Sequence, residues 1–158
     1  MVKFAIYTFL GFWMESIYVS IYKKEIYFSG LLKGPFIPLY GFGALIILGI
    51  APFAHNNFDL FFYSMIACTF IEYLTHFFLQ YDAQIQIWDY TVFNQRFSNR
   101  ICMFYSLIWG ILGILLVNII DPFITQYLSV FHPTLLNVTA FFYVMYILYQ
   151  FYNHHFQH

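Results

Sequence analysis

The sequence predicts an all-α polytopic membrane bundle of about five transmembrane helices, forming a single domain over residues 1–158. Of its 158 residues, 62% are apolar and 8% are charged, against about 25% charged in soluble domains. Repeated apolar runs approach the ~20 residues that cross a bilayer core. These runs do not alternate in polarity as the strands of an outer-membrane barrel would, so helices are favoured.

Five apolar runs are separated by short polar segments. The first ends where Lys23, Lys24 and Glu25 enter water, and Asp59 suits the N-terminal end of the third. Asp121-Pro122 predicts the end of the fourth. Residues 80–100 are polar and are expected to lie against the membrane surface, as are residues 123–132. The predicted spans are residues 4–22, 36–53, 60–79, 101–120 and 133–152.

The basic residues predict the orientation of the chain. With five spans, five of the six lie on one side of the membrane and only Lys3 lies opposite. The positive-inside rule then places the N-terminus outside and the C-terminus in the cytoplasm. The first run is interpreted as a retained span, because Glu15 interrupts it and no small-x-small cleavage site follows.

Composition and motifs narrow the function classes. A net charge of -1 with six basic residues provides no cationic face for phosphates, so nucleic acid is not an expected partner. Cys68 and Cys102 fall inside apolar spans and are interpreted as small hydrophobic residues. No catalytic or ATP-binding motif is found in the sequence, so no cofactor is expected and the question of enzymatic activity stays open. Any ATP would be bound by another chain.

Two glutamates fall inside apolar spans, where a carboxylate needs compensation. Glu15 shares a helix face with Thr8 and Gly11, and Glu72 shares one with His76. One hypothesis is that Glu15, Glu72 and His76 line a polar cavity that relays a proton or holds a cationic group. The alternative is that the glutamates are protonated and only hydrogen-bond neighbouring helices. A metal site is not expected, because a Glu-x-x-x-His pair supplies too few ligands.

Further polar candidates lie between the third and fourth spans. Asp89 is expected to pair with a basic residue, and Arg100 either grips a phosphate or carboxylate or meets anionic lipid head groups. On the fourth span, Ser106, Gly110 and Gly113 form a small-residue stripe. Such a stripe is more typical of helix packing than of a substrate surface.

Six short motifs occur in a characteristic order: GFWMESIY at residues 11–18, GPFIPLYGFG at 34–43, EY at 72–73, WDY at 88–90, RIC at 100–102 and SLIWG at 106–110. In this respect the chain resembles the type IV ABC-transporter permease family, often called CmpB-like. The resemblance implies a small bacterial protein of the cytoplasmic membrane with a role in transport. It singles out Glu15, Gly34, Pro35, Pro38, Tyr40, Gly41, Glu72, Asp89 and Arg100.

The chain departs from the family pattern at three places. The family usually has Asn-Arg-Gly ahead of the Gly-Pro loop, where this chain has Phe28, Ser29 and Gly30. In the family a glycine usually precedes the arginine that corresponds to Arg100, whereas this chain has Asn99 there. The family often has an acidic residue after the third span, where this chain has Gln80. These changes count against a mechanism based on charge pairs.

The leading hypothesis is a permease subunit of an ABC-type transporter that moves a small molecule through a polar site in the bundle. The expected partners are membrane lipid and either a separate ATPase subunit or further copies of the chain. The rival hypothesis is a membrane-embedded enzyme or accessory factor acting on a lipid-linked substrate or a partner protein. The predicted substrate-binding residues are Glu15, Tyr40, Glu72, His76, Asp89 and Arg100.

Overall fold

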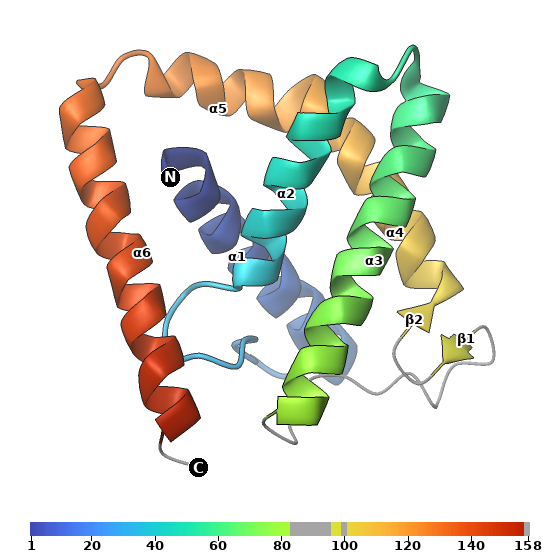
Figure 1. Cartoon of the computed structure of the whole chain (residues 1–158), viewed down its shortest axis with the longest axis horizontal. Coiled ribbons are helices and arrows are strands. Elements are labelled where there is room, and N and C mark those ends of the chain that lie inside the picture. The colour runs from blue at the N-terminus through green and yellow to red at the C-terminus, as the bar shows by residue number, and fades with distance from the viewer. Residues whose placement is uncertain (83–95, 99–100, 157–158) are drawn as a thin grey trace. The chain divides into compact units, whose positions relative to one another are not determined.

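The computed structural model describes residues 1–82, 96–98 and 101–156 and is predominantly helical (Figure 1). Its helices are α1 (Val2–Lys23), α2 (Pro38–Ile50), η1 (Ala51–Phe53), α3 (Asn57–Asp82), α4 (Met103–Leu115), η2 (Leu116–Ile120), α5 (Asp121–Leu128) and α6 (Pro133–Phe156). Two short antiparallel strands, β1 (Arg96–Ser98) and β2 (Ile101–Cys102), precede α4. The prediction of a helical membrane protein is confirmed.

Among the described residues, four helices are long and apolar enough to cross a bilayer, namely Val2–Lys23, Asn57–Gln80, Met103–Leu128 and Pro133–Asn153. The second predicted span corresponds to a shorter apolar helix, Pro38–Phe53. At 1.5 Å per residue this helix is about 24 Å long, which is less than the ~30 Å of a bilayer core. By length it is therefore not among the helices that could span the bilayer alone.

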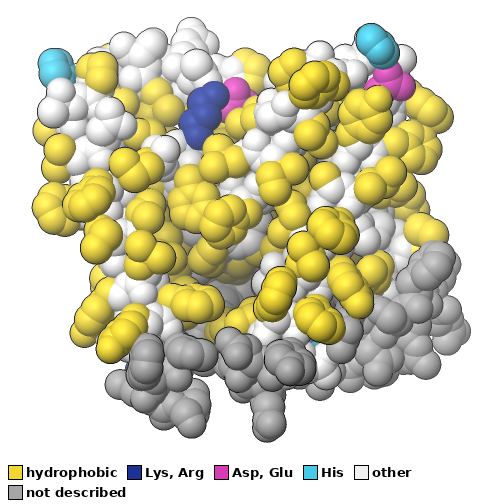
Figure 2. Space-filling view, viewed as in Figure 1, with side chains coloured by type: hydrophobic (Ala, Val, Ile, Leu, Met, Phe, Trp, Pro, Cys, Tyr) yellow, Lys and Arg dark blue, Asp and Glu magenta, His cyan; other side chains and the backbone are white. Residues whose placement is uncertain are grey.

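Apolar side chains dominate the outside of these helices. The most apolar windows of the four long helices are only 11–28% buried within the chain. On the face drawn in Figure 2, hydrophobic side chains cover most of the described surface. In water such a surface would aggregate, whereas in a bilayer it contacts acyl chains.

By their internal contacts, the residues divide into two compact units. The terminal unit comprises Met1–Phe42 and Phe131–His158, and the central unit comprises Gly43–Val130. The boundary falls inside α2. The prediction of a single domain stays a prediction.

In the terminal unit, glycines allow α1 and the start of α2 to pack closely. A Cβ at Gly11 would collide with the Tyr40 side chain, and a Cβ at Gly41 would collide with Thr8 and Phe4. The face of α1 that carries Thr8 and Gly11 is therefore in close contact with α2. The core of this unit contains Leu32, Phe36 and Ile147, so the chain between α1 and α2 packs against α6.

In the central unit, α3 and α4 pack through small residues. Ser106, Gly110 and Gly113 are buried on α4. A Cβ at Gly110 would collide with the Phe61 ring, and a Cβ at Gly113 would collide with Ser64. This close approach confirms the prediction that the stripe is a packing face.

The start of α3 carries reciprocal side-chain caps. The Asn56 side-chain oxygen accepts hydrogen bonds from the backbone N–H groups of Phe58 and Asp59, at 2.8 and 3.0 Å. The Asp59 carboxylate accepts one from the N–H of His55 at 3.0 Å. This arrangement satisfies N–H groups that the helix leaves without partners, and it confirms the predicted place of Asp59.

Two boundary predictions for the fourth span are wrong. Ile101–Cys102 forms strand β2, and the helix starts at Met103. The helix also continues through Asp121-Pro122 to Leu128, because the π-helical turn η2 lies between α4 and α5. There the N–H of Asp121 bonds the Leu116 carbonyl five residues back. This wider turn accommodates Pro122, which has no N–H to donate.

Candidate functional site

The segment of residues 24–37 returns along α1. The N–H of Tyr27 donates to the Ser20 hydroxyl at 2.9 Å, and the N–H of Ser29 donates to the Ser16 hydroxyl at 3.0 Å. Further along, the N–H of Ile37 donates to the Thr8 carbonyl at 3.2 Å. From Ser20 to Thr8 this covers about 18 Å of helix axis. Non-helical backbone therefore lies beside most of a membrane-spanning helix.

Helix α6 provides further partners for the same segment. The Tyr143 hydroxyl donates to the Pro35 carbonyl at 3.0 Å, and the Tyr146 hydroxyl donates to the Lys33 carbonyl at 3.4 Å. At membrane depth, non-helical backbone is tolerated only where protein or a water-filled cavity satisfies its polar groups. Donors from α6 and acceptors from α1 supply such partners to part of this segment.

Sequence reasoning placed residues 23–35 in a loop and residues 36 and 37 in the second span, and it missed this return along α1. Gly30 and Gly34 adopt φ values of +117° and +152°, which L side chains rarely adopt. Ser16 and Ser20 are four residues apart and present their hydroxyls on one face of α1. This combination of glycines in the loop and spaced serines on the helix was the available signal.

Glu15, on α1, contacts both the returning segment and the start of α2. Its side chain is partly buried, and its carboxylate accepts hydrogen bonds from the hydroxyls of Tyr40 and Ser29. Tyr40 belongs to the first turn of α2, where the partial positive charge of a helix N-terminus favours a nearby anion. The structure thus brings together two of the predicted site residues, Glu15 and Tyr40, and adds Ser29.

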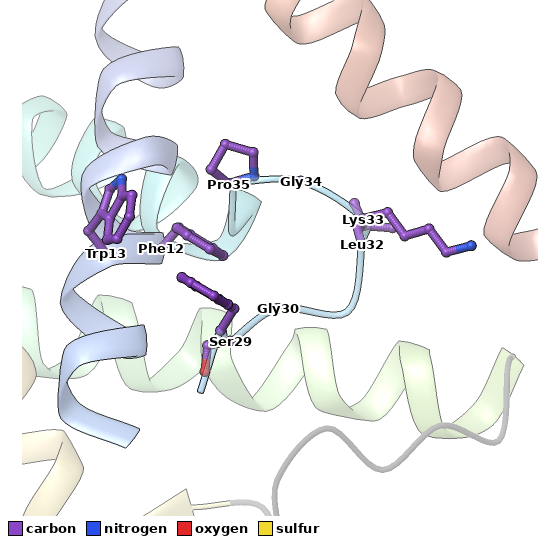
Figure 3. A pocket seen from close by; sticks show the side chains of 9 residues that line it. Phe12, Trp13, Ser29, Gly30, Leu32, Lys33, Gly34 and Pro35 are labelled. Carbon is purple, nitrogen blue, oxygen red and sulfur yellow. The ribbon is translucent and has the colours of Figure 1, made fainter. Parts of the chain in front are cut away.

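An open pocket of about 430 Å³ lies beside Glu15 in the terminal unit (Figure 3). Three aromatic rings form one side of it. The ring centroids of Phe12 and Phe28 are 6.3 Å apart with nearly parallel planes, and Trp13 stands edge-on at 5.6 Å from Phe12 and 6.4 Å from Phe28. The lining residues are Phe12, Trp13, Phe28, Ser29, Gly30, Leu32, Lys33, Gly34 and Pro35.

Ser29 connects the pocket to the carboxylate. Ser29 lines the pocket, and its hydroxyl donates a hydrogen bond to the Glu15 carboxylate. Glu15 itself does not line the pocket and is connected to it through Ser29. Lys33 lines the pocket too, but Figure 3 shows its side chain extending away from Phe12 and Trp13. The pocket therefore combines ring surfaces with a nearby carboxyl group.

The central unit contains the second group of predicted site residues. Glu72 is only 4% exposed, and its carboxylate accepts a hydrogen bond of 3.1 Å from the indole N–H of Trp109. Ser64, Cys68, Glu72 and His76 follow one another every fourth residue on α3, and all four are buried. The predicted shared face of Glu72 and His76 is confirmed, and it faces the interior of this unit.

Three further predictions concern Asp89 and Arg100, a cavity shared by Glu15 and Glu72, and a metal site. Asp89 and Arg100 lie outside the described residues. The described contacts place Glu15 in the terminal unit and Glu72 in the central unit, so a cavity common to both stays a prediction. Within the described part of the chain, no group of three or more His, Cys, Asp or Glu side chains is placed to hold a metal ion.

Long apolar helices with carboxylates on two of them define a multi-spanning membrane protein with interior polar groups. The chain belongs to the family described as "Putative ABC-transporter type IV" (CmpB), whose model matches residues 2–154. The family predicted from the ordered motifs is thus confirmed. No curated protein and no solved structure matches the chain significantly.

Proposed function

We propose that this chain is the permease subunit of an ABC transporter and that its substrate contacts the polar group around Glu15. The observation that carries the proposal is the non-helical segment 24–37 beside α1, with an open pocket and a membrane carboxylate next to it. Transporter binding sites are typically built where membrane helices are interrupted near the middle of the bilayer. Membership of the family supports the same class.

Within this proposal, Glu15 and Tyr40 belong to the substrate-binding group, with Ser29 between the Glu15 carboxylate and the pocket. Glu72 and His76 form a second polar group in the central unit, which the substrate meets at another stage or which stabilises that unit. Asp89 and Arg100 remain proposed contacts at the cytoplasmic face. The N-terminus is proposed to lie outside and the C-terminus inside, as the distribution of basic residues indicates.

A separate ATPase subunit is the proposed energy source. The chain contains no phosphate-binding glycine loop of the GxxxxGK[ST] type, so ATP would have to be bound by a partner. Purification of the tagged chain in lipid nanodiscs, followed by mass spectrometry of bound proteins, is expected to recover an ATPase. Further copies of the chain are the other proposed partner and would be counted by native mass spectrometry.

Transport is tested with inverted membrane vesicles containing the complex. Untargeted mass spectrometry compares vesicle contents with ATP and with a non-hydrolysable analogue. The wild-type complex is expected to accumulate or lose at least one small molecule in an ATP-dependent way. Glu15→Gln is expected to abolish that change while the ATPase still co-purifies. Unchanged contents together with an altered lipid profile would instead favour the enzyme or accessory role on a lipid-linked substrate.

A further inference from the structure

We propose that the pocket beside Glu15 binds a small organic cation, either a quaternary ammonium or a protonated amine. That this cation is the transported substrate rests on the proposed function. That the pocket binds the cation is a separate claim and is tested without the ATPase. The inference depends on three features of the terminal unit: exposed aromatic surface, the position of the nearby charges, and the size of the pocket.

The aromatic surface suits a cation more than a neutral or anionic group. Phe28 is 63% exposed and Trp13 is 43% exposed, so both rings offer surface to a ligand. Because the planes of the two rings meet at 82°, a ligand cation would lie over the face of one of them, within the ~6 Å at which ring faces attract positive charge. Clusters of such rings are the usual means of recognising quaternary ammonium groups.

The positions of Glu15 and Lys33 also favour a cationic ligand. The Glu15 carboxylate lies behind Ser29 and, with two hydroxyl donors, keeps further acceptor capacity. The Lys33 side chain extends away from Trp13 in Figure 3, so the Lys33 ammonium group does not cover that ring. The same segment already holds a cation over an aromatic ring, because the Lys23 ammonium lies 3.5 Å from the centre of the Tyr27 ring.

The pocket size limits the ligand to a compact molecule. A volume of about 430 Å³ lies at the lower end of the range for small-molecule sites, roughly 300–1,000 Å³. A choline-sized head group fits this space, whereas a large peptide or a folded polymer does not. The pocket is also open to the outside, so a longer tail on the cation could extend out of it.

The test measures binding of radiolabelled choline to the chain in nanodiscs, with no ATPase present. Choline is the probe, and 3,3-dimethylbutan-1-ol serves as a neutral competitor of the same shape. Choline is expected to bind saturably, and unlabelled choline is expected to compete at least 10-fold better than the alcohol. Equal competition by the two compounds would show that charge is not recognised and would overturn the proposal.

Three variants locate the site. Phe28→Leu and Trp13→Leu are each expected to weaken choline binding about 3- to 30-fold, and Glu15→Gln is expected to weaken it as well. Phe142→Leu is the matched control, because Phe142 on α6 is 67% exposed and does not line the pocket. Thermal unfolding of each variant checks its fold. Wild-type affinity in a folded Phe28→Leu protein would place any choline site elsewhere and contradict the proposal.

The binding and transport outcomes are distinguishable. Choline binding without a co-purifying ATPase would retain the cation site and reject the proposed permease role. A co-purifying ATPase with ATP-dependent movement of a neutral or anionic compound, and no choline binding, would retain the permease role and reject the cation site.

Discussion

Glu15 and Glu72 both lie on membrane-spanning helices, but their surroundings differ. Glu15 is partly buried and accepts hydrogen bonds from two hydroxyl groups. One of these hydroxyls belongs to Ser29, which lines an open pocket. Glu72 is almost fully buried and accepts a hydrogen bond from Trp109 within the tightly packed α3–α4 pair. The two carboxylates therefore differ in their partners: Glu15 bonds Ser29, which lines a pocket, whereas Glu72 bonds Trp109 within a helix pair.

The largest expected effect is at the α3–α4 packing face. Gly113→Ala would place a methyl group where Ser64 already lies, so we expect overpacking to destabilise the protein by about 1–3 kcal/mol. The measurement is thermal unfolding in detergent. Gly49→Ala is the matched control, because a Cβ at Gly49 meets nothing within 4 Å. Equal midpoints for the two variants would refute the close approach of α3 and α4.

A smaller effect is expected at the buried carboxylate. Trp109→Phe keeps an aromatic ring but removes the N–H that bonds Glu72. Hydrogen bonds between membrane helices contribute about 0.6 kcal/mol on average and up to about 1.7 kcal/mol, and we expect a loss in that range. A variant with unaltered stability would mean that this bond does not hold Glu72 in place.

The smallest effect on stability is expected at Glu15. In Glu15→Gln the side-chain oxygen still accepts from Tyr40 and Ser29, and loss of the charge removes a burial cost. We therefore expect a change of less than about 0.5 kcal/mol in unfolding free energy, alongside weaker choline binding. If Glu15→Gln instead lowered stability as much as Trp109→Phe and left binding intact, both carboxylates would be structural.

Much of the fold follows from the sequence, because long apolar runs and helical spacing act locally. The faces of Glu15 with Gly11, and of Glu72 with His76, could be predicted from a period of 3.6 residues. The helix through Pro122 could not, because a proline after aspartate resembles a stop, and only the π-helical turn η2 accommodates it. Strand β2 was also missed, since Ile101 and Cys102 resemble the apolar helix that follows.

The candidate site was only partly predictable. Glu15 stood out because ionisable residues are rare in membrane spans. The return of residues 24–37 along α1 depends on bonds between residues far apart in sequence, such as Tyr143 with Pro35. No local pattern specifies such contacts, so the aromatic pocket with Phe28 and Trp13 was not foreseen.

The most direct measurement tests whether the chain after α1 doubles back beside it. With Cys68 and Cys102 replaced by alanine, the pair Ser16→Cys and Ser29→Cys is oxidised in the membrane and its peptides are analysed by mass spectrometry. The 3.0 Å bond between Ser16 and the backbone of Ser29 places the two residues within disulfide reach, so near-complete crosslinking is expected, against little for Ser16→Cys with Lys24→Cys. Absence of a 16–29 crosslink would mean that the segment lies in water and that the pocket beside Glu15 does not form.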